Sequence, residues 1–285
     1  MSGPDQPEAA GPDATVQNTN FIDGFLRSPF SGIAPWVLMG IMSGPGRFGQ
    51  SAAAALTLTL IVMWAGSRRG IKVHSLEVFG AVVFAVFVGL GIVGSPTLIS
   101  TMELWAGEIT NGSLAAYILV TLVIRKPFTI AYARDTVDPE HWNSPLFVRV
   151  NYILTAVWAG AFLINTLVGS FGDVVLHDGD NFWTGWIVQL AVTLVAVAIT
   201  EFYPDYARAR FLAATAESSD TPPSFGKLLD WLPGFVIGIG IAGWVSDSLS
   251  AGVGIALIVV GIVAGAIMRK LFPEKEEDGQ RPASS

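Results

Sequence analysis

The sequence predicts an all-α membrane protein, a polytopic transmembrane helical bundle of six to eight helices with two of them short or re-entrant. Three observations predict this class. Apolar residues make up 52% of the 285-residue chain and charged residues only 14%, against roughly 25% charged residues in a typical soluble domain. The apolar residues form long runs that end at breaks rich in Gly, Pro or Ser. The Lys and Arg residues are sorted to one side of these runs, as in multi-pass membrane proteins.

The basic residues set the predicted orientation, because cytoplasmic loops carry an excess of Lys and Arg. All of the sixteen Lys and Arg residues except Arg47 can be placed on one side of the membrane. The basic clusters that follow apolar runs are Arg68, Arg69, Lys72, Arg125, Lys126, Arg134, Arg149, Arg208, Arg210, Lys227, Arg269, Lys270, Lys275 and Arg281. The intervening connections carry the acidic residues Glu103, Glu108, Asp173, Asp178, Asp180 and Asp247. We therefore expect a multi-pass protein of the plasma (inner) membrane with both termini in the cytoplasm.

Eight apolar segments are expected to be helical, in the order 33–42, 51–66, 75–94, 98–124, 147–171, 182–203, 231–245 and 251–271. The stretch 98–110 is amphipathic and is expected to be the interfacial start of one helix that continues to 124, while Pro204 should end another. Segments 33–42 and 231–245 barely span a bilayer at about 1.5 Å per residue. Counting both as crossings gives eight spans, and treating both as re-entrant gives six.

The two short segments also suggest an internal repeat. Pro35 and Pro233 fit the first turn of a helix, where the missing N–H is not needed, and Gly40 and Gly238 follow five residues later. We expect two helical hairpins at comparable positions in the bundle, with the Gly238 and Gly240 face buried, although apolar helices can also look alike by chance. The predicted domains are a disordered cytoplasmic tail 1–20, a membrane domain 28–215, a linker 216–230, an extra hairpin 231–271 repeating 33–69, and a disordered acidic cytoplasmic tail 272–285.

The densest polar constellation is the connection around 125–149, which combines cations, prolines and aromatic residues. Its candidate contacts with a lipid headgroup or a partner protein are Arg125, Lys126, Arg134, His141, Trp142 and Arg149. The same residues have a structural interpretation. Cations can cap the negative end of a helix and extend to anionic headgroups, and a tryptophan can anchor a helix at the interface. Both interpretations stay open at this point.

Inside the predicted spans, Asn165 and Gln189 are the candidate interior polar residues. Such an Asn either links two helices, a contact of about 0.6 kcal/mol, or binds a substrate. No charged residue lies near a mid-membrane position, which disfavours a proton-coupled pump. A transporter predicts a polar-lined cavity between the two helix pairs that reaches Asn165 or Gln189, whereas a scaffold predicts solid packing there.

Composition and motifs disfavour several classes of protein. The chain has no cysteine, which excludes disulfides and thiolate metal sites, and its net charge of −7 disfavours nucleic-acid binding. The three histidines lie in separate loops, and Glu103 and Glu108, five residues apart on one predicted helix, should face different ways. No nucleophile elbow or phosphate-binding loop is present. We therefore expect no enzyme activity, no cofactor and no bound metal.

The connection also carries a family resemblance. It contains Arg-Lys-Pro-Phe at 125–128, Glu-His-Trp at 140–142, Asn151, and then Trp158, Ala159 and Phe162. Over about residues 28–206 this order resembles the bacterial septation protein A family of inner-membrane proteins. The family's Leu-Asp-Phe-Leu-Pro type start is better matched at 229–233 than near Pro35, which puts partner contacts of the family's ends in doubt.

The resemblance implies a non-enzymatic inner-membrane protein with a role in cell envelope maintenance or septation, acting through protein or lipid contacts on its cytoplasmic face. The expected partners are the lipid bilayer and envelope or division proteins, with a homo-oligomer left open. The alternative is a transporter or scramblase for a small apolar or lipid substrate, in which the two hairpins form gates. Paired short segments broken by Gly or Pro are typical of transporter binding sites.

Overall fold

The computed structural model describes residues 21–179, 181–214 and 222–272, which form an all-α bundle without strands. Seven of its helices are long and apolar enough to cross a membrane: Phe48–Arg68, Ser75–Val93, Ala106–Val123, Pro145–Leu176, Phe182–Ala214, Phe225–Val245 and Ala251–Leu271. An eighth apolar helix, Pro29–Met42, is shorter. The predicted fold class, a polytopic bundle of six to eight helices, is therefore confirmed.

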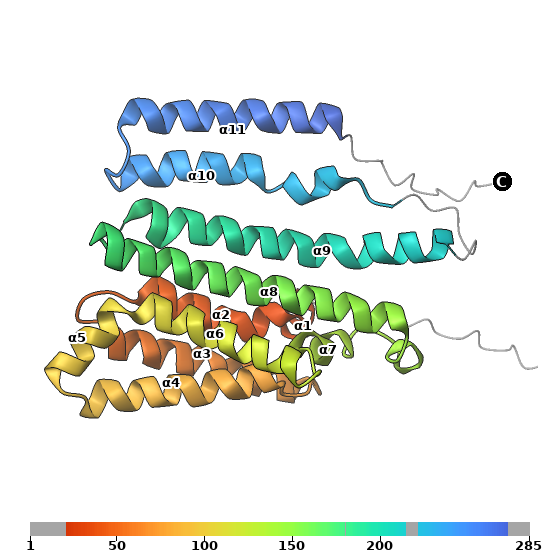
Figure 1. The fold of residues 1–285 in the computed structure, drawn as a ribbon, viewed down its shortest axis with the longest axis horizontal. Helices are drawn as coiled ribbons and strands as arrows, with labels where there is room; N and C mark the ends of the chain where they lie inside the picture. The colour runs from red at the N-terminus through yellow and green to blue at the C-terminus, as the bar shows by residue number, and fades with distance from the viewer. Residues whose placement is uncertain (1–20, 180, 215–221, 273–285) are drawn as a thin grey trace, which may run out of the picture.

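The long helices run side by side, with α8, α9, α10 and α11 following one another toward one edge and α4 lying at the opposite edge (Figure 1). The α-helices are α1 Phe21–Leu26, α2 Pro29–Met42, α3 Phe48–Arg68, α4 Ser75–Val93, α5 Pro96–Leu104, α6 Ala106–Val123, α7 Phe128–Ala133, α8 Pro145–Phe171, α9 Val188–Ala214, α10 Leu232–Val245 and α11 Ala251–Leu271. The 3-10 helices are Pro139–His141 and Phe225–Leu229, and π-helical turns at Gly172–Leu176 and Phe182–Ile187 extend α8 and α9 toward each other.

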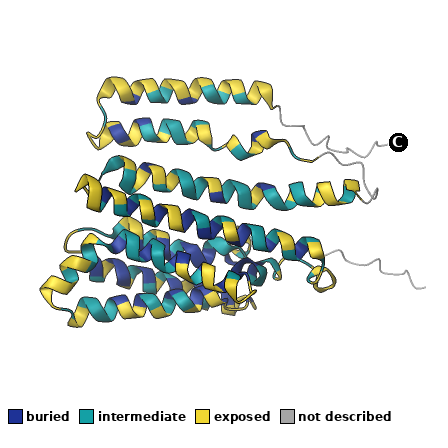
Figure 2. Ribbon diagram, viewed as in Figure 1, coloured by how far each residue is buried: buried dark blue, intermediate teal, exposed yellow. Residues whose placement is uncertain are grey.

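The core lies around α2, which packs against α3, α4 and α6. Trp36 and Met39 of α2 are buried, and Trp36 stacks on Phe79 and lies against Phe84. Farther along, α6 packs on α8 and α8 on α9. Figure 2 shows the buried residues concentrated in this part of the bundle. The short helix α2 is therefore shielded by protein on the side that faces these helices.

The hairpin of α10 and α11 lies at the edge of the bundle beside α9, and most of its surface is exposed (Figures 1 and 2). Each short segment pairs with the helix that follows it, α2 with α3 and α10 with α11, as predicted. The prediction that the two hairpins occupy comparable positions is wrong. Helix α2 is enclosed by three other helices, whereas α10 has its main partner in α11 alone.

The glycines of α10 are only partly explained by close packing. Gly240 is buried against Gly254, since a Cβ at residue 240 would meet the Gly254 carbonyl oxygen at 2.6 Å. Gly238 is exposed and has open space where a Cβ would be. Two residues turn an α-helix by about 200°, so Gly238 and Gly240 cannot face the same partner. The prediction that both are buried is wrong for Gly238.

Three predicted helix boundaries also differ from the structure. Helix α2 begins at Pro29, so Pro35 lies inside it instead of in its first turn. The expected helix 98–124 divides at Trp105 into α5 and α6. Helix α9 continues through Pro204 to Ala214. A proline removes one backbone hydrogen bond from a helix. Helices α2 and α9 both contain an internal proline and accommodate that loss within longer runs of intact bonds.

The connections alternate between two ends of the bundle (Figure 1), and the charged residues of the sequence are sorted with them. One end, the basic end, carries the α3–α4 turn, the connection from α6 to α8 and the C-terminal ends of α9 and α11. The other, the acidic end, carries α5 and the α2–α3, α8–α9 and α10–α11 turns. Thus all described basic clusters share one end, with Arg47 the exception, as predicted. Which compartment this end faces stays a prediction.

Several predictions fall on residues outside the described part of the chain. These are the tail 1–20, most of the acidic tail, the start of the linker, and the charged residues Asp180, Lys275 and Arg281. The later part of the predicted linker, Phe225–Leu229, is a 3-10 helix that leads into α10. That helical turn lengthens segment 231–245 enough for it to count among the candidate spans.

Candidate functional site

A cavity of about 730 Å³ opens at the acidic end. It lies among α2, α5, α6, α8, α9 and the α8–α9 turn, and its apolar walls include Trp36, Leu114 and Phe162. Asn165 and Gln189, the two interior polar residues singled out in the sequence, both line it. The cavity therefore reaches both residues, and its lining combines apolar and polar side chains. It lies in the main bundle and not between the two hairpins.

Regular helical spacing builds the polar wall. Residues four apart lie on one face of a helix, about one turn or 5.4 Å from each other. On α8 and its π-helical extension these are Asn165, Gly169 and Asp173, and on α9 they are Gln189 and Thr193. The two rows face each other because α8 and α9 pack together.

Asn165 is the deepest polar residue of this wall, with only 3% of its surface exposed. Its Nδ2 donates to Thr193 Oγ1 at 3.2 Å, and that hydroxyl donates to the Gln189 carbonyl at 2.8 Å. In this arrangement Thr193 Oγ1 accepts from the Asn165 amide while its own proton goes to Gln189. Asn165 Oδ1 is buried, and no donor in the described part of the chain reaches it.

Gln189 joins three elements with its side chain. Its Nε2 donates to the Thr184 carbonyl at 2.9 Å, and its Oε1 accepts from Asn111 Nδ2 of α6 at 3.2 Å. Both ends of the Gln189 amide are thus engaged, and the contact with Asn111 links α6 to α9. Of the two interior polar residues, Asn165 is the one with an unused acceptor.

The charged lining of the cavity is acidic. The described lining contains no Lys or Arg. It contains four carboxylic residues, Glu103, Glu108, Asp173 and Asp178. The carboxyl groups of Glu108 and Asp173 lie close enough to interact. The Glu108 carboxylate also packs over Gly169, where any Cβ would collide with it.

Glu103 and Glu108 both line the cavity, but their carboxylates have different neighbours, the Phe48 backbone for Glu103 and Gly169 for Glu108. Their spacing of five residues was interpreted on one continuous helix, but Trp105 separates α5 from α6. The break at Trp105 leaves both residues in the lining of the same cavity. Glu103 also accepts a long hydrogen bond of 3.5 Å from the Phe48 backbone N–H, which links α5 to the start of α3.

At the basic end, the six predicted contact residues do not converge on one point. Arg134 lies over the Trp142 ring at 5.1 Å, and Trp142 Nε1 donates to the Val137 carbonyl at 2.8 Å. His141 lies 3.9 Å from Glu140. Arg125, Lys126 and Arg149 are exposed, and Arg125 adopts a left-handed backbone conformation with φ 57°. Among the described residues, none of the four cations has an acidic partner.

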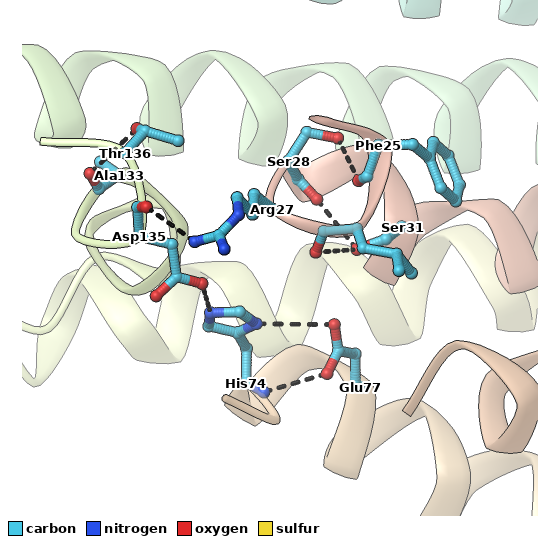
Figure 3. A network of polar contacts seen from close by, with 10 residues as sticks. Phe25, Arg27, Ser28, Ser31, His74, Glu77, Ala133, Asp135 and Thr136 are labelled. Carbon is cyan, nitrogen blue, oxygen red and sulfur yellow. Dashed lines mark hydrogen bonds and ion pairs between the residues drawn. The ribbon is translucent and has the colours of Figure 1, made fainter. Parts of the chain in front are cut away.

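A buried network near this end was missed in the sequence (Figure 3). His74 Nε2 lies 2.9 Å from Asp135 Oδ2, and His74 Nδ1 lies 3.5 Å from Glu77 Oε1. The Glu77 carboxylate also accepts from the His74 backbone N–H at 3.0 Å, and Arg27 Nη1 donates to the Asp135 carbonyl at 3.1 Å. The His74 ring stacks on Tyr132 at 4.0 Å. The network therefore ties the α1–α2 junction, the start of α4 and α7 together.

The environment of His74 shifts its pKa in two opposing ways. Burial is the largest single influence and lowers the pKa, because it disfavours the charged ring. Glu77 and Asp135 raise the pKa through hydrogen bonds and charge, and together they outweigh burial. The pKa of His74 is therefore above its ordinary value of 6.5. The sequence signal for part of this network is Glu77, which lies three residues after His74, the N-cap residue of α4.

Comparisons with protein families, with curated proteins and with solved structures find no match to this chain. Its function therefore has to be inferred from the chemistry of the two ends. The acidic end offers a cavity with fixed polar groups, and the basic end offers exposed cations around a rigid buried network.

Proposed function

We propose that this multi-pass membrane protein transports a small polar solute, which enters the cavity at the acidic end. The observation that carries the proposal is the polar wall that leads from Asp173 inward to Asn165. The volume of about 730 Å³ falls within the roughly 300–1,000 Å³ that is typical of small-molecule sites. The acidic lining supports a polar substrate over the apolar or lipid substrate expected from sequence. The hairpins have unrelated positions, so they do not support the expected pair of gates.

The inner end of the cavity is closed by an aromatic barrier. Phe162 lines the cavity and stacks on Trp158, with ring centroids 5.6 Å apart. One turn farther toward the basic end, Thr155 is fully buried and pairs with Thr129 at 2.9 Å. Polar groups thus lie on both sides of the two rings along α8. A cavity open at one end and closed by a barrier is what alternating access requires of a transporter.

Cysteine accessibility tests this proposal, because the chain contains no cysteine of its own. In the protein reconstituted in lipid nanodiscs, Asn111→Cys on the cavity wall should react with a small charged methanethiosulfonate reagent. Thr155→Cys, behind the barrier, and Val82→Cys, on an exposed apolar face of α4, should stay unreacted. Adding Phe162→Ala to Thr155→Cys should make that cysteine reactive. An unreactive Asn111→Cys would contradict the proposal, since a solute could not reach the cavity either.

A second proposed function rests on the basic end. Arg125, Lys126, Arg134 and Arg149 are exposed cations without an acidic partner in the described residues, and Trp142 lies beside one of them. This arrangement suits contacts with anionic lipid headgroups or acidic protein surfaces. Together with the resemblance to the septation protein A family, it supports a non-enzymatic role in envelope maintenance or septation. The paired substitution of Arg125 and Lys126 described in the Discussion tests this function.

A further inference from the structure

We propose that the cavity binds an organic cation with an N–H donor, a primary or secondary ammonium, at Glu108, Asp173 and Asn165. This inference rests on the proposed function, because it requires that a solute enters the cavity. It adds the chemical class of the solute and the groups that select it.

The charge of the cavity selects a cation. Its described lining contains four carboxylic residues and lacks Lys and Arg. Glu108 and Asp173 interact with each other, and two carboxylates at close range repel each other when both are ionised. A cation placed beside both would relieve this repulsion and gain attraction from each. An anion would meet repulsion from every charged group of the lining.

The hydrogen-bonding groups select a donor. Asn165 Oδ1 is a buried acceptor without a donor in the described part of the chain, whereas the Asp173 carboxyl group interacts with Glu108. Asn165 Nδ2 is already engaged by Thr193 Oγ1, so the free group of this amide is its acceptor. A buried acceptor without a partner is unfavourable, so a ligand N–H is the complementary group. This requirement favours an ammonium with N–H groups over a fully methylated one.

The apolar walls select an organic ion over a bare one. Trp36, Leu114 and Phe162 line the inner part of the cavity, and Trp186 lines the outer part. Aromatic faces attract cations and accept the apolar body of a ligand at the same time. A small inorganic ion would use the carboxylates and leave these surfaces unused. The mixture of acids, one free amide oxygen and aromatic rings therefore fits an amine with a hydrocarbon body.

The test uses the full chain in nanodiscs and four probes that share one hydrocarbon body. These are 2-phenylethylammonium, its N,N,N-trimethyl derivative, 2-phenylethanol and 3-phenylpropionate, titrated against tryptophan fluorescence with protein-free nanodiscs subtracted. The primary ammonium should bind saturably and more tightly than the trimethyl derivative, and the alcohol and the carboxylate should show no saturation. Equal binding of all four probes, or tightest binding of the carboxylate, would overturn the inference.

Substitutions then assign the site. Glu108→Gln should weaken binding of the primary ammonium about tenfold or more, because a hydrogen bond to a charged group is lost, and Glu108→Asp should restore much of it. Gly169→Ala keeps every charge but displaces the Glu108 carboxylate, so it should weaken binding as well. Asn165→Leu should weaken the primary ammonium and leave the trimethyl derivative unchanged. Asp247→Asn is the matched control, since Asp247 lies at the same end but outside the cavity lining, and it should change nothing.

The outcomes separate this inference from the function on which it rests. A reactive Asn111→Cys together with no preference for the ammonium would leave the solute pathway standing and reject the cation site. An unreactive Asn111→Cys would reject both. Variants are compared only where their size-exclusion profile and thermal unfolding match the wild-type protein. Equal loss of affinity in Glu108→Gln and Asp247→Asn would also reject the site, because a general field of negative charge would then explain the binding.

Discussion

The contact between α10 and α11 allows a prediction in which two glycines of one helix give opposite results. At Gly261 of α11, an added Cβ would lie 2.8 Å from the Pro233 carbonyl oxygen and 3.1 Å from the Ile237 backbone nitrogen. Backbone atoms cannot rotate out of the way, so the helices must separate. At Gly265, one turn later, an added Cβ would lie 3.4 Å from Pro233 Cβ, which is an ordinary contact.

The expected magnitude follows from these distances. Replacing Gly by Ala inside a helix gains about 1 kcal/mol in helix propensity, and this gain is the same in both variants. Overpacking a close contact costs about 1–3 kcal/mol, and only Gly261→Ala incurs that cost. The free energies of unfolding of Gly261→Ala and Gly265→Ala should therefore differ by about 1–3 kcal/mol, with Gly265→Ala the more stable.

Unfolding by SDS in mixed micelles, followed by circular dichroism, measures this difference. Trp244 packs against Gly254 in the same hairpin, so tryptophan fluorescence reports on local separation of the two helices. Gly261→Ala should also change this fluorescence at SDS concentrations where Gly265→Ala does not. If Gly261→Ala proved as stable as Gly265→Ala, the two helices would not be in backbone contact, and the explanation given for the buried glycines would fail.

The other predictions concern the ends of the bundle. Because the pKa of His74 is raised in the folded protein, its stabilising effect is fully present below the ordinary value of 6.5 and is lost as pH rises through the raised value. The difference in thermal stability between wild type and His74→Gln should thus shrink from about pH 6 to pH 8, and a constant difference would contradict the ion-pair network. Replacing Arg125 and Lys126 together by Gln should weaken binding to vesicles that contain anionic lipid and leave zwitterionic vesicles unaffected. If the double variant is present at a normal protein level and still binds anionic vesicles unchanged, these two residues do not contact lipid headgroups. Envelope defects in cells that contain this variant at a normal level would then support a contact with a partner protein. The orientation is tested with single cysteines and an impermeant thiol reagent added to intact cells. The reagent should label cysteines that replace Asp178 and Asp247 at the acidic end, and it should not label cysteines that replace Ser67 and Ser144 at the basic end.

Much of the fold could be predicted because a membrane span leaves a simple record in the sequence. Segment 251–271 matches α11 at both ends, and 75–94 matches α4 to within one residue. The errors arose where one local signal was weighed alone. Pro204 does not end α9, since the run of helical residues on both sides keeps the helix intact. Trp105 was not recognised as a break, because no Gly or Pro marks it.

The candidate site was only partly predictable, and the reason lies in which helices meet. Asn165 and Gln189 could be identified as polar residues in apolar runs, and the steps of four from Asn165 to Gly169 and Asp173 were visible in the sequence. What the sequence does not record is that this face of α8 meets α6 and α9 and not lipid. The same holds for His74 and Asp135, which are far apart in the chain and meet only in the folded bundle. Contacts of this kind depend on tertiary packing, and in membranes that packing relies on small residues. Gly169 is one of them: its missing side chain makes room for the Glu108 carboxylate. A glycine placed between two polar residues at helical spacing is therefore a better sequence signal for a polar cavity than either polar residue alone.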